Sequence, residues 1–185
     1  MEAAVDDAIR HDNRLRDDSA CREGRVIVGV DGSLGSLGAL RRAVAEARRR
    51  DMQLCAVRVV RQEHLRLGPA PLQEEDVAHL REQINAAYED ALGGMPGDLR
   101  TRSVVIVGTP GRSLVGYARH EDDLLVVGAG GRSRWRRWWN GSVSGYCVQH
   151  ARCPVLTVPL SEFARTMRRV RLPRRRGGLK ELLNA

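Results

Sequence analysis

The sequence has few aromatic residues and almost no lysine. Aromatic residues make up 4% of the 185 residues, so a core must be built from valine, leucine, alanine and isoleucine, as in buried parallel sheets. Lys180 is the only lysine, and the formal net charge of +8 comes almost entirely from arginine. Arginine content also follows genome composition, so this charge favours anionic ligands in general without indicating a nucleic-acid-binding protein.

Long apolar runs are also missing. No apolar run approaches the roughly 20 residues that cross a bilayer, and the first residues are acidic rather than basic. The sequence therefore predicts neither a membrane span nor a secretory signal, and we expect a cytoplasmic protein without a membrane partner. A length of 185 residues suits one α/β domain with tails.

The four cysteines show no paired framework, which is typical of reduced thiols in the cytoplasm. Cys147, His150 and Cys153 form C-x2-H-x2-C, a spacing that could supply zinc ligands. On a helix followed by a Cys-Pro turn, however, these residues fall on different faces, and no fourth ligand lies nearby in the sequence. We therefore predict no metal site, with zinc as the lesser alternative.

Charge divides the chain into three segments. Residues 1–24 carry 4 basic and 7 acidic side chains, and we expect a flexible acidic N-terminal arm. Residues 25–160 form the predicted domain. Residues 161–185 carry 8 basic and 2 acidic side chains. A solvated basic tail is favoured there over a nucleic-acid contact, because no aromatic residues are interleaved with the arginines.

Strands and helices alternate through the predicted domain. Apolar runs predict strands over residues 25–30, 53–60, 101–107, 124–127 and 155–158. Helical periodicity predicts helices over 33–50, 74–92 and 112–120, and a further helix begins near residues 141–144. This alternation indicates right-handed crossovers and one parallel α/β sheet.

A glycine-rich loop follows the fourth predicted strand. The strand Leu124–Val127 ends at Gly128, Gly130 and Gly131, and after nine intervening residues comes Gly141-Ser142-Val143-Ser144. Without a Cβ atom, glycine lets backbone N–H groups approach an anion closely. A small-residue helix start adds hydroxyl groups and a favourable dipole. The segment therefore indicates a phosphate-binding loop.

The spacing G-x2-G-x9-G-[ST], formed by Gly128, Gly131, Gly141 and Ser142, resembles the nucleotide-binding signature of the universal stress protein family, in its ATP-binding branch. The resemblance covers residues 25–159. It implies a single open five-stranded parallel sheet of strand order 3-2-1-4-5 with helices on both faces, the adenine nucleotide alpha hydrolase-like fold. In that order the first and fourth strands are neighbours, which would bring Asp31 beside the glycine loop.

The resemblance also assigns roles to individual residues. It gives Asp31 the role of accepting hydrogen bonds from ribose hydroxyls, with Gly29 and Val30 as backbone neighbours of the base. The backbone of Val59 would read the adenine edge. Taken alone, Asp31 would more simply be a helix N-cap or a turn residue.

The predicted phosphate cradle combines backbone N–H groups, hydroxyls and one arginine that could fold over the phosphates with paired hydrogen bonds. Its members are Gly128, Gly130, Gly131, Arg132, Gly141, Ser142, Val143 and Ser144. The segment 132–140 contains three tryptophans and several arginines, unlike the smaller residues expected of the family. Its role, and that of the basic tail, stays open.

A Walker A motif, G-x4-G-K-[ST], is absent, and no convincing general base lies near the loop. We therefore expect a site that holds ATP, with or without Mg²⁺, and is at most a slow ATPase. The resemblance implies a regulatory protein acting through an unnamed protein partner. An apolar edge strand at 155–158 predicts a homodimer. The alternatives are a nucleotide-independent dimeric interaction module and a nucleic-acid-associated stress factor using the basic tail.

Overall fold

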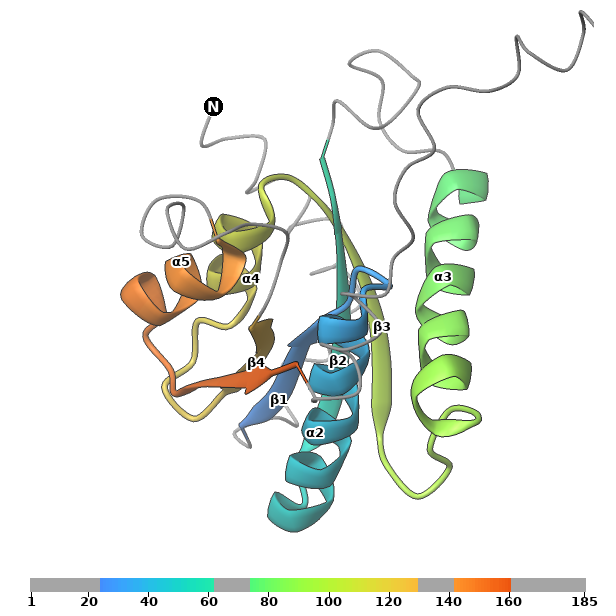
Figure 1. The fold of residues 1–185 in the computed structure, drawn as a ribbon, viewed down its shortest axis with the longest axis horizontal. Coiled ribbons are helices and arrows are strands. Elements are labelled where there is room, and N and C mark those ends of the chain that lie inside the picture. Colours follow the sequence, from blue (N-terminus) through green and yellow to red (C-terminus); the bar gives the residue numbers. More distant parts are fainter. Residues whose placement is uncertain (1–23, 62–73, 130–141, 161–185) are drawn as a thin grey trace, which may run out of the picture.

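The computed structural model describes residues 24–61, 74–129 and 142–160, which form a single parallel sheet flanked by helices (Figure 1). The strand order is β3-β2-β1-β4-β5, and every neighbouring pair is parallel. This confirms the predicted fold class and strand order. The strands are β1 (Arg25–Gly29), β2 (Gln53–Val60), β3 (Thr101–Val107), β4 (Leu124–Ala129) and β5 (Val155–Pro159).

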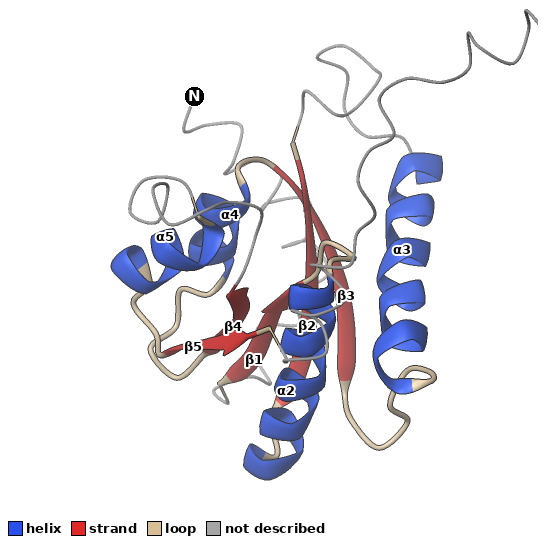
Figure 2. Cartoon of the chain, in the orientation of Figure 1, coloured by secondary structure: helices blue, strands red, loops and turns tan. Residues whose placement is uncertain are grey.

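Helices cover both faces of the sheet (Figure 2). Helices α2 (Leu34–Arg50) and α3 (Glu74–Leu92) lie on one face, and α4 (Pro110–Tyr117) and α5 (Val143–His150) lie on the other. Within the described ranges, no helix combines the length and the apolar character needed to cross a membrane.

Two hydrophobic cores sandwich the sheet, one on each face. On β1, Val26 and Val28 point into the core under α2 and α3, whereas Ile27 points into the core under α4. All three side chains are fully buried. Because both faces of the central strands are covered, those strands read as continuous apolar runs rather than as alternating patterns.

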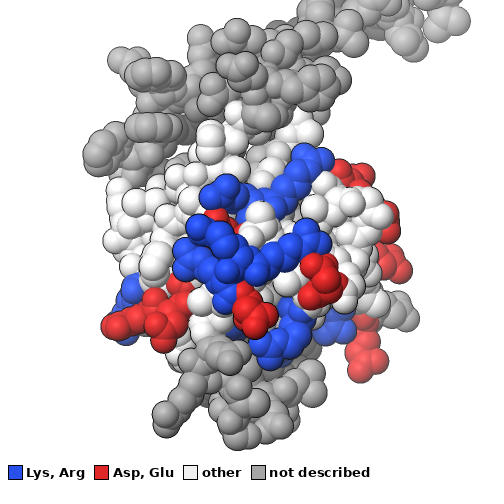
Figure 3. All heavy atoms as spheres, turned by 90° about the horizontal axis from the view of Figure 1, so that it is seen from below, with Lys and Arg blue, Asp and Glu red and all other residues white. Residues whose placement is uncertain are grey.

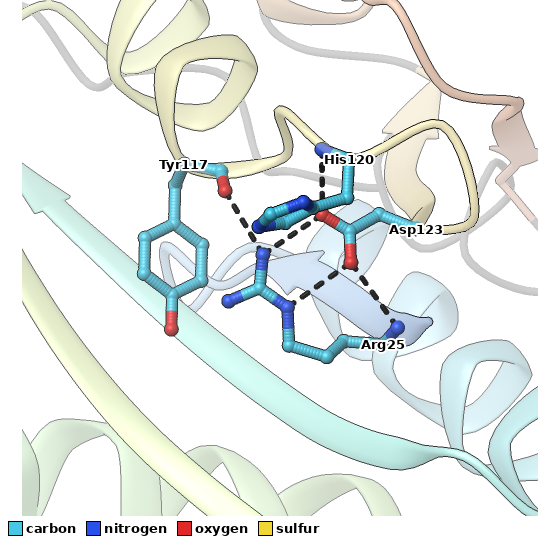
Figure 4. A network of polar contacts seen from close by, with 4 residues as sticks. All are labelled: Arg25, Tyr117, His120 and Asp123. Carbon is cyan, nitrogen blue, oxygen red and sulfur yellow. Dashed lines mark hydrogen bonds and ion pairs between the residues drawn. The ribbon is translucent and has the colours of Figure 1, made fainter. Parts of the chain in front are cut away.

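A buried ion pair joins the amino ends of β1 and β4 (Figure 4). The guanidinium of Arg25 donates from Nε to Oδ1 of Asp123 at 3.0 Å and from Nη2 to Oδ2 at 2.8 Å. The backbone N–H of Arg25 also donates to Oδ1, and that of His120 donates to Oδ2. Burial opposes the charge on Arg25, but the hydrogen bond to Asp123 raises the pKa of the guanidinium above its ordinary value.

Basic and acidic side chains are interleaved on the face where α2 ends (Figure 3). The buried carboxylate of Glu46 pairs with Arg42, Arg49 and Arg50 on the same helix. Arg48 pairs with Asp98 across the surface. These arginines therefore contact carboxylates of their own chain.

Two elements, α4 and β4, have a boundary two or more residues away from the prediction. Helix α4 begins at Pro110 and ends at Tyr117, whereas we predicted 112–120. Proline is well suited to the first turn of a helix because its missing N–H would have no partner there. At the other end the N–H of His120 bonds to Asp123 instead of continuing the helix. Strand β4 extends to Ala129, two residues past the predicted end.

Candidate functional site

The carboxyl ends of β2, β1 and β4 meet at one edge of the sheet. In β1, Val28 pairs with Val126 of β4, and Gly29 pairs with Val57 of β2. The segments that follow these pairs along each strand therefore lie at the same edge. This is where ligands of open parallel α/β sheets bind.

Asp31 leads from β1 into the first turn of α2. Its Oδ1 accepts a hydrogen bond from the N–H of Ser33 at 3.0 Å, and its own N–H donates to the hydroxyl of Ser36 at 3.3 Å. The N-cap of α2 is Ser33, whose hydroxyl accepts from the N–H of Ser36. Asp31 is thus a turn residue rather than the N-cap, and its side chain is exposed.

The surroundings of Asp31 favour the ionised form of its carboxylate. Loss of hydration to the surrounding protein would raise its pKa, but hydrogen bonds from Ser33 and Ser36 and the nearby charge of Arg58 lower the pKa below its ordinary value. A carboxylate that stays ionised can only accept hydrogen bonds. Asp31 is therefore suited to binding hydroxyl groups.

Gly128, near the end of β4, packs against the start of α2. A Cβ atom at position 128 would lie 2.5 Å from the carbonyl oxygen of Gly35, which is in the first turn of α2. This close backbone approach requires glycine at 128 for packing, whether or not a ligand is bound. It also brings the end of β4 against the turn that contains Asp31.

The site residues predicted at the end of β1 and on β2 make packing contacts or backbone hydrogen bonds within the chain. A Cβ atom at Gly29 would lie 3.0 Å from Cδ1 of Leu114 on α4. Val30 is buried, and its N–H donates to the carbonyl of Val57 at 2.9 Å. Val59 is half-buried and packs against the core under α4.

The start of α5 supplies N–H groups and hydroxyls. The N-cap Ser142 accepts a hydrogen bond from the N–H of Gly145 at 3.0 Å. That contact uses an oxygen lone pair and leaves the hydroxyl proton free to donate. Val143 and Ser144 follow in the first turn, where backbone N–H groups have no partner within the helix. The predicted Gly130, Gly131, Arg132 and Gly141, with the arginine- and tryptophan-rich segment, lie outside the described residues.

The residues of the C-x2-H-x2-C spacing do not come together as a group of metal ligands. His150 is exposed and stacks on Tyr146 with ring centroids 4.1 Å apart, whereas Cys147 and Cys153 are buried. Burial raises the pKa of the Cys147 thiol to about 11. In the part of the chain that the structure describes, no three His, Cys, Asp or Glu side chains are grouped to hold a metal ion.

Sequence reasoning missed one residue at this edge. Arg58 interrupts the apolar strand β2, and its Nη1 donates to the carbonyl of Val30 at 3.3 Å. The sequence signal that could have identified it is the single charged residue inside the apolar run QLCAVRVV.

Comparisons with known sequences agree with this architecture. The sequence model of the universal stress protein family matches residues 24–159. A universal stress protein of Mycobacterium tuberculosis is 30% identical over 140 residues, which are 72% of this chain and 47% of that protein. A Staphylococcus aureus protein named for the same family is 31% identical over 143 residues, 75% of this chain and 85% of that protein. The chain spans about half the length of the mycobacterial relatives that it matches.

Solved structures of universal stress proteins are also similar to this chain. The universal stress protein UspA from Lactobacillus plantarum superposes with a TM-score of 0.55 at 24% identity, covering 75% of this chain and 99% of that one, and shows the same fold. A universal stress protein in complex with cAMP has a TM-score of 0.52 at 29% identity, covering 75% of this chain and 98% of that one. With the family match over most of the domain and the predicted strand order observed, this chain belongs to the universal stress protein family.

Proposed function

We propose that this protein is a regulatory adenine-nucleotide-binding protein that holds ATP at the carboxyl ends of β1 and β4. Asp31 accepts the ribose hydroxyls, and the backbone of Val30 and Val59 lies along the base. The phosphates bind the loop that follows Gly128 and the first turn of α5, which begins after Ser142.

The contact between Gly128 and Gly35 carries this proposal. It brings the end of β4 against the first turn of α2, which supports placing the proposed ribose acceptor Asp31 and the start of the proposed phosphate loop near each other. The ionised, exposed Asp31 supports the first role. The unpaired N–H groups at the start of α5 support the second, because a helix N-terminus favours anions.

One relative adds support. A universal stress protein with 29% identity to this chain was solved in complex with cAMP, an adenine nucleotide. A Mg²⁺ ion that accompanied ATP would keep several of its waters and bind phosphate oxygens, with at most one or two carboxylates from the protein, as is usual for this ion.

The test begins with the purified protein. Mass spectrometry of the released small molecules should detect an adenine nucleotide, and calorimetry should show binding of ATP with and without Mg²⁺. Asp31→Ala should weaken ATP binding by about 10-fold to 100-fold, because hydrogen bonds to a charged group contribute about 1.5–3 kcal/mol.

Asp98→Ala is the matched control, since Asp98 is an exposed aspartate paired only with Arg48 among the described contacts. It should leave ATP affinity unchanged. Absence of binding by ATP, ADP, AMP and cAMP in the wild-type protein would contradict the proposal and favour a nucleotide-independent interaction module. Deletion of 161–185 should remove any salt-sensitive nucleic-acid binding and leave ATP affinity nearly unchanged.

We also propose a homodimer formed through β5. This strand pairs with β4 alone among the described strands, so its other edge presents backbone N–H and C=O groups. Its apolar side chains Val155, Leu156 and Val158 are half-buried against the two cores of their own chain, so the support comes from the backbone edge. Light scattering after size-exclusion chromatography should give twice the chain mass of 20.5 kDa. A monomer at tens of micromolar would contradict it.

A further inference from the structure

Arg58 links β2 to the end of β1. Its backbone pairs with Val105 of β3, and its side chain reaches across to the carbonyl of Val30, to which Nη1 donates at 3.3 Å. Val30 immediately precedes Asp31, and Val59 immediately follows Arg58. The guanidinium therefore contacts the backbone that leads to the proposed ribose acceptor, and the backbone of Arg58 adjoins the residue proposed to lie along the base.

The same guanidinium carries an unsatisfied donor. Its Nε is buried and has no hydrogen-bond partner among the described residues. Buried polar groups are nearly always paired, and one left unpaired costs stability. An arginine kept only for the fold would not need this cost, because an apolar side chain of similar length would fill the same space.

Arg58 also acts electrostatically on Asp31. Loss of hydration would raise the pKa of Asp31, and hydrogen bonds from Ser33 and Ser36, together with the positive charge of Arg58, lower it. A positive charge near a carboxylate favours its ionised form. The single side chain thus acts on both the carbonyl of Val30 and the carboxylate of Asp31.

We propose that Arg58 is a positioning residue of the nucleotide site, holding Val30 and thereby the direction in which Asp31 leaves β1 before any ligand binds. The inference rests on the proposed function. Groups that are fixed in the binding geometry in advance gain affinity, because less conformational freedom is lost on binding.

Three variants test this role. Arg58→Met keeps the length of the side chain but removes its charge and donors, and Arg58→Lys restores a charge. Arg119→Met is the control, since Arg119 is exposed and precedes the amino end of β4, away from the carboxyl edge. The measurements are ATP affinity by calorimetry, the Asp31 pKa by ¹³C NMR titration of the ligand-free protein, and the melting temperature Tm.

Arg58→Met should weaken ATP binding by about 10-fold and raise the pKa of Asp31. It should change Tm little, because removal of the unsatisfied donor offsets the loss of the hydrogen bond to the carbonyl of Val30. Arg58→Lys should bring the pKa of Asp31 back toward its wild-type value and recover part of the affinity. Arg119→Met should change none of the three.

Two outcomes would overturn the inference while the proposed function stands. One is wild-type ATP affinity in Arg58→Met. The other is a loss of affinity in Arg58→Met that comes with a large fall in Tm and an unchanged Asp31 pKa, which would make Arg58 a purely structural residue. Failure of the wild-type protein to bind any of the four adenine nucleotides would instead overturn the proposed function itself.

Discussion

Gly128 at the end of β4 packs directly on Gly35 in the first turn of α2, so closely that a Cβ atom at position 128 would lie 2.5 Å from the carbonyl oxygen of Gly35. Two backbones in contact leave no room for a side chain between them. The glycine that begins the phosphate-loop signature therefore has a packing role that is independent of any nucleotide.

The first prediction follows from this contact. Gly128→Ala should lower the free energy of unfolding by about 1–3 kcal/mol, the usual cost of forcing an extra carbon into a packed site. Thermal or urea unfolding measures the change. Loss of ATP binding in this variant alone would not identify a phosphate contact, because the fold itself is disturbed.

Gly38→Ala is the matched control on α2. No atom lies within 4 Å of its Cβ position, and alanine is favoured over glycine inside a helix by roughly 0.5–1 kcal/mol. We expect a small increase in stability. Equal effects of the two substitutions would show that the contact with Gly35 does not constrain position 128.

The second prediction concerns the buried pair of Arg25 and Asp123. Asp123→Ala should destabilise the fold by about 3–5 kcal/mol, because it leaves the guanidinium buried without its counter-charge. Asp98→Ala, which breaks the exposed pair with Arg48, should change Tm very little. Chemical unfolding measures the loss of stability in both variants. Similar losses would contradict the expectation that the buried pair is more costly to break than the exposed one.

The third prediction is the pH dependence of Asp31. Its pKa is lowered in the folded protein, so its contribution to stability is present above the ordinary aspartate pKa of about 3.9 and is lost as pH falls through the lowered value. The difference in Tm between wild type and Asp31→Asn should be constant from pH 7 to pH 5 and shrink in more acidic solution. A difference that grows on acidification would contradict the assignment.

The fourth prediction concerns Tyr88, which is fully buried with an unpaired hydroxyl among the described residues. Tyr88→Phe should keep stability unchanged or raise it by up to about 1–3 kcal/mol, because an unsatisfied polar group is removed. Burial raises the pKa of Tyr88 to about 12, so this side chain should stay un-ionised until strongly alkaline pH in an absorbance titration. A clear fall in stability would reveal a partner for the hydroxyl.

Much of the fold could be predicted because its core strands are short continuous apolar runs. The strand at 53–60 and the helix at 74–92 match β2 and α3 residue for residue. The strand order followed from the family resemblance, and it placed Asp31 and Gly128 at the same edge. The carboxyl ends of parallel strands share an edge, so the placement of these two residues at one edge could be predicted from the sequence, whereas their roles in a site stay a prediction.

Side-chain contacts between elements could not be predicted in the same way. The capping of α2 by Ser33 rather than Asp31 depends on local geometry that the residue types alone leave open, since both are good caps. The packing of Gly128 on Gly35 and the reach of Arg58 to Val30 depend on how strands and helices meet. Periodicity reports which face a residue occupies, and it carries no information about its neighbours on other elements.

The ion pair of Arg25 and Asp123 lies at the end of β1 and β4 opposite to the proposed ligand. Because it anchors the two strands that contribute Asp31 and Gly128, it sets their relative alignment from a distance. Weakened nucleotide binding in an Arg25 variant would therefore indicate that β1 and β4 are misaligned. It would not by itself show that Arg25 contacts the nucleotide.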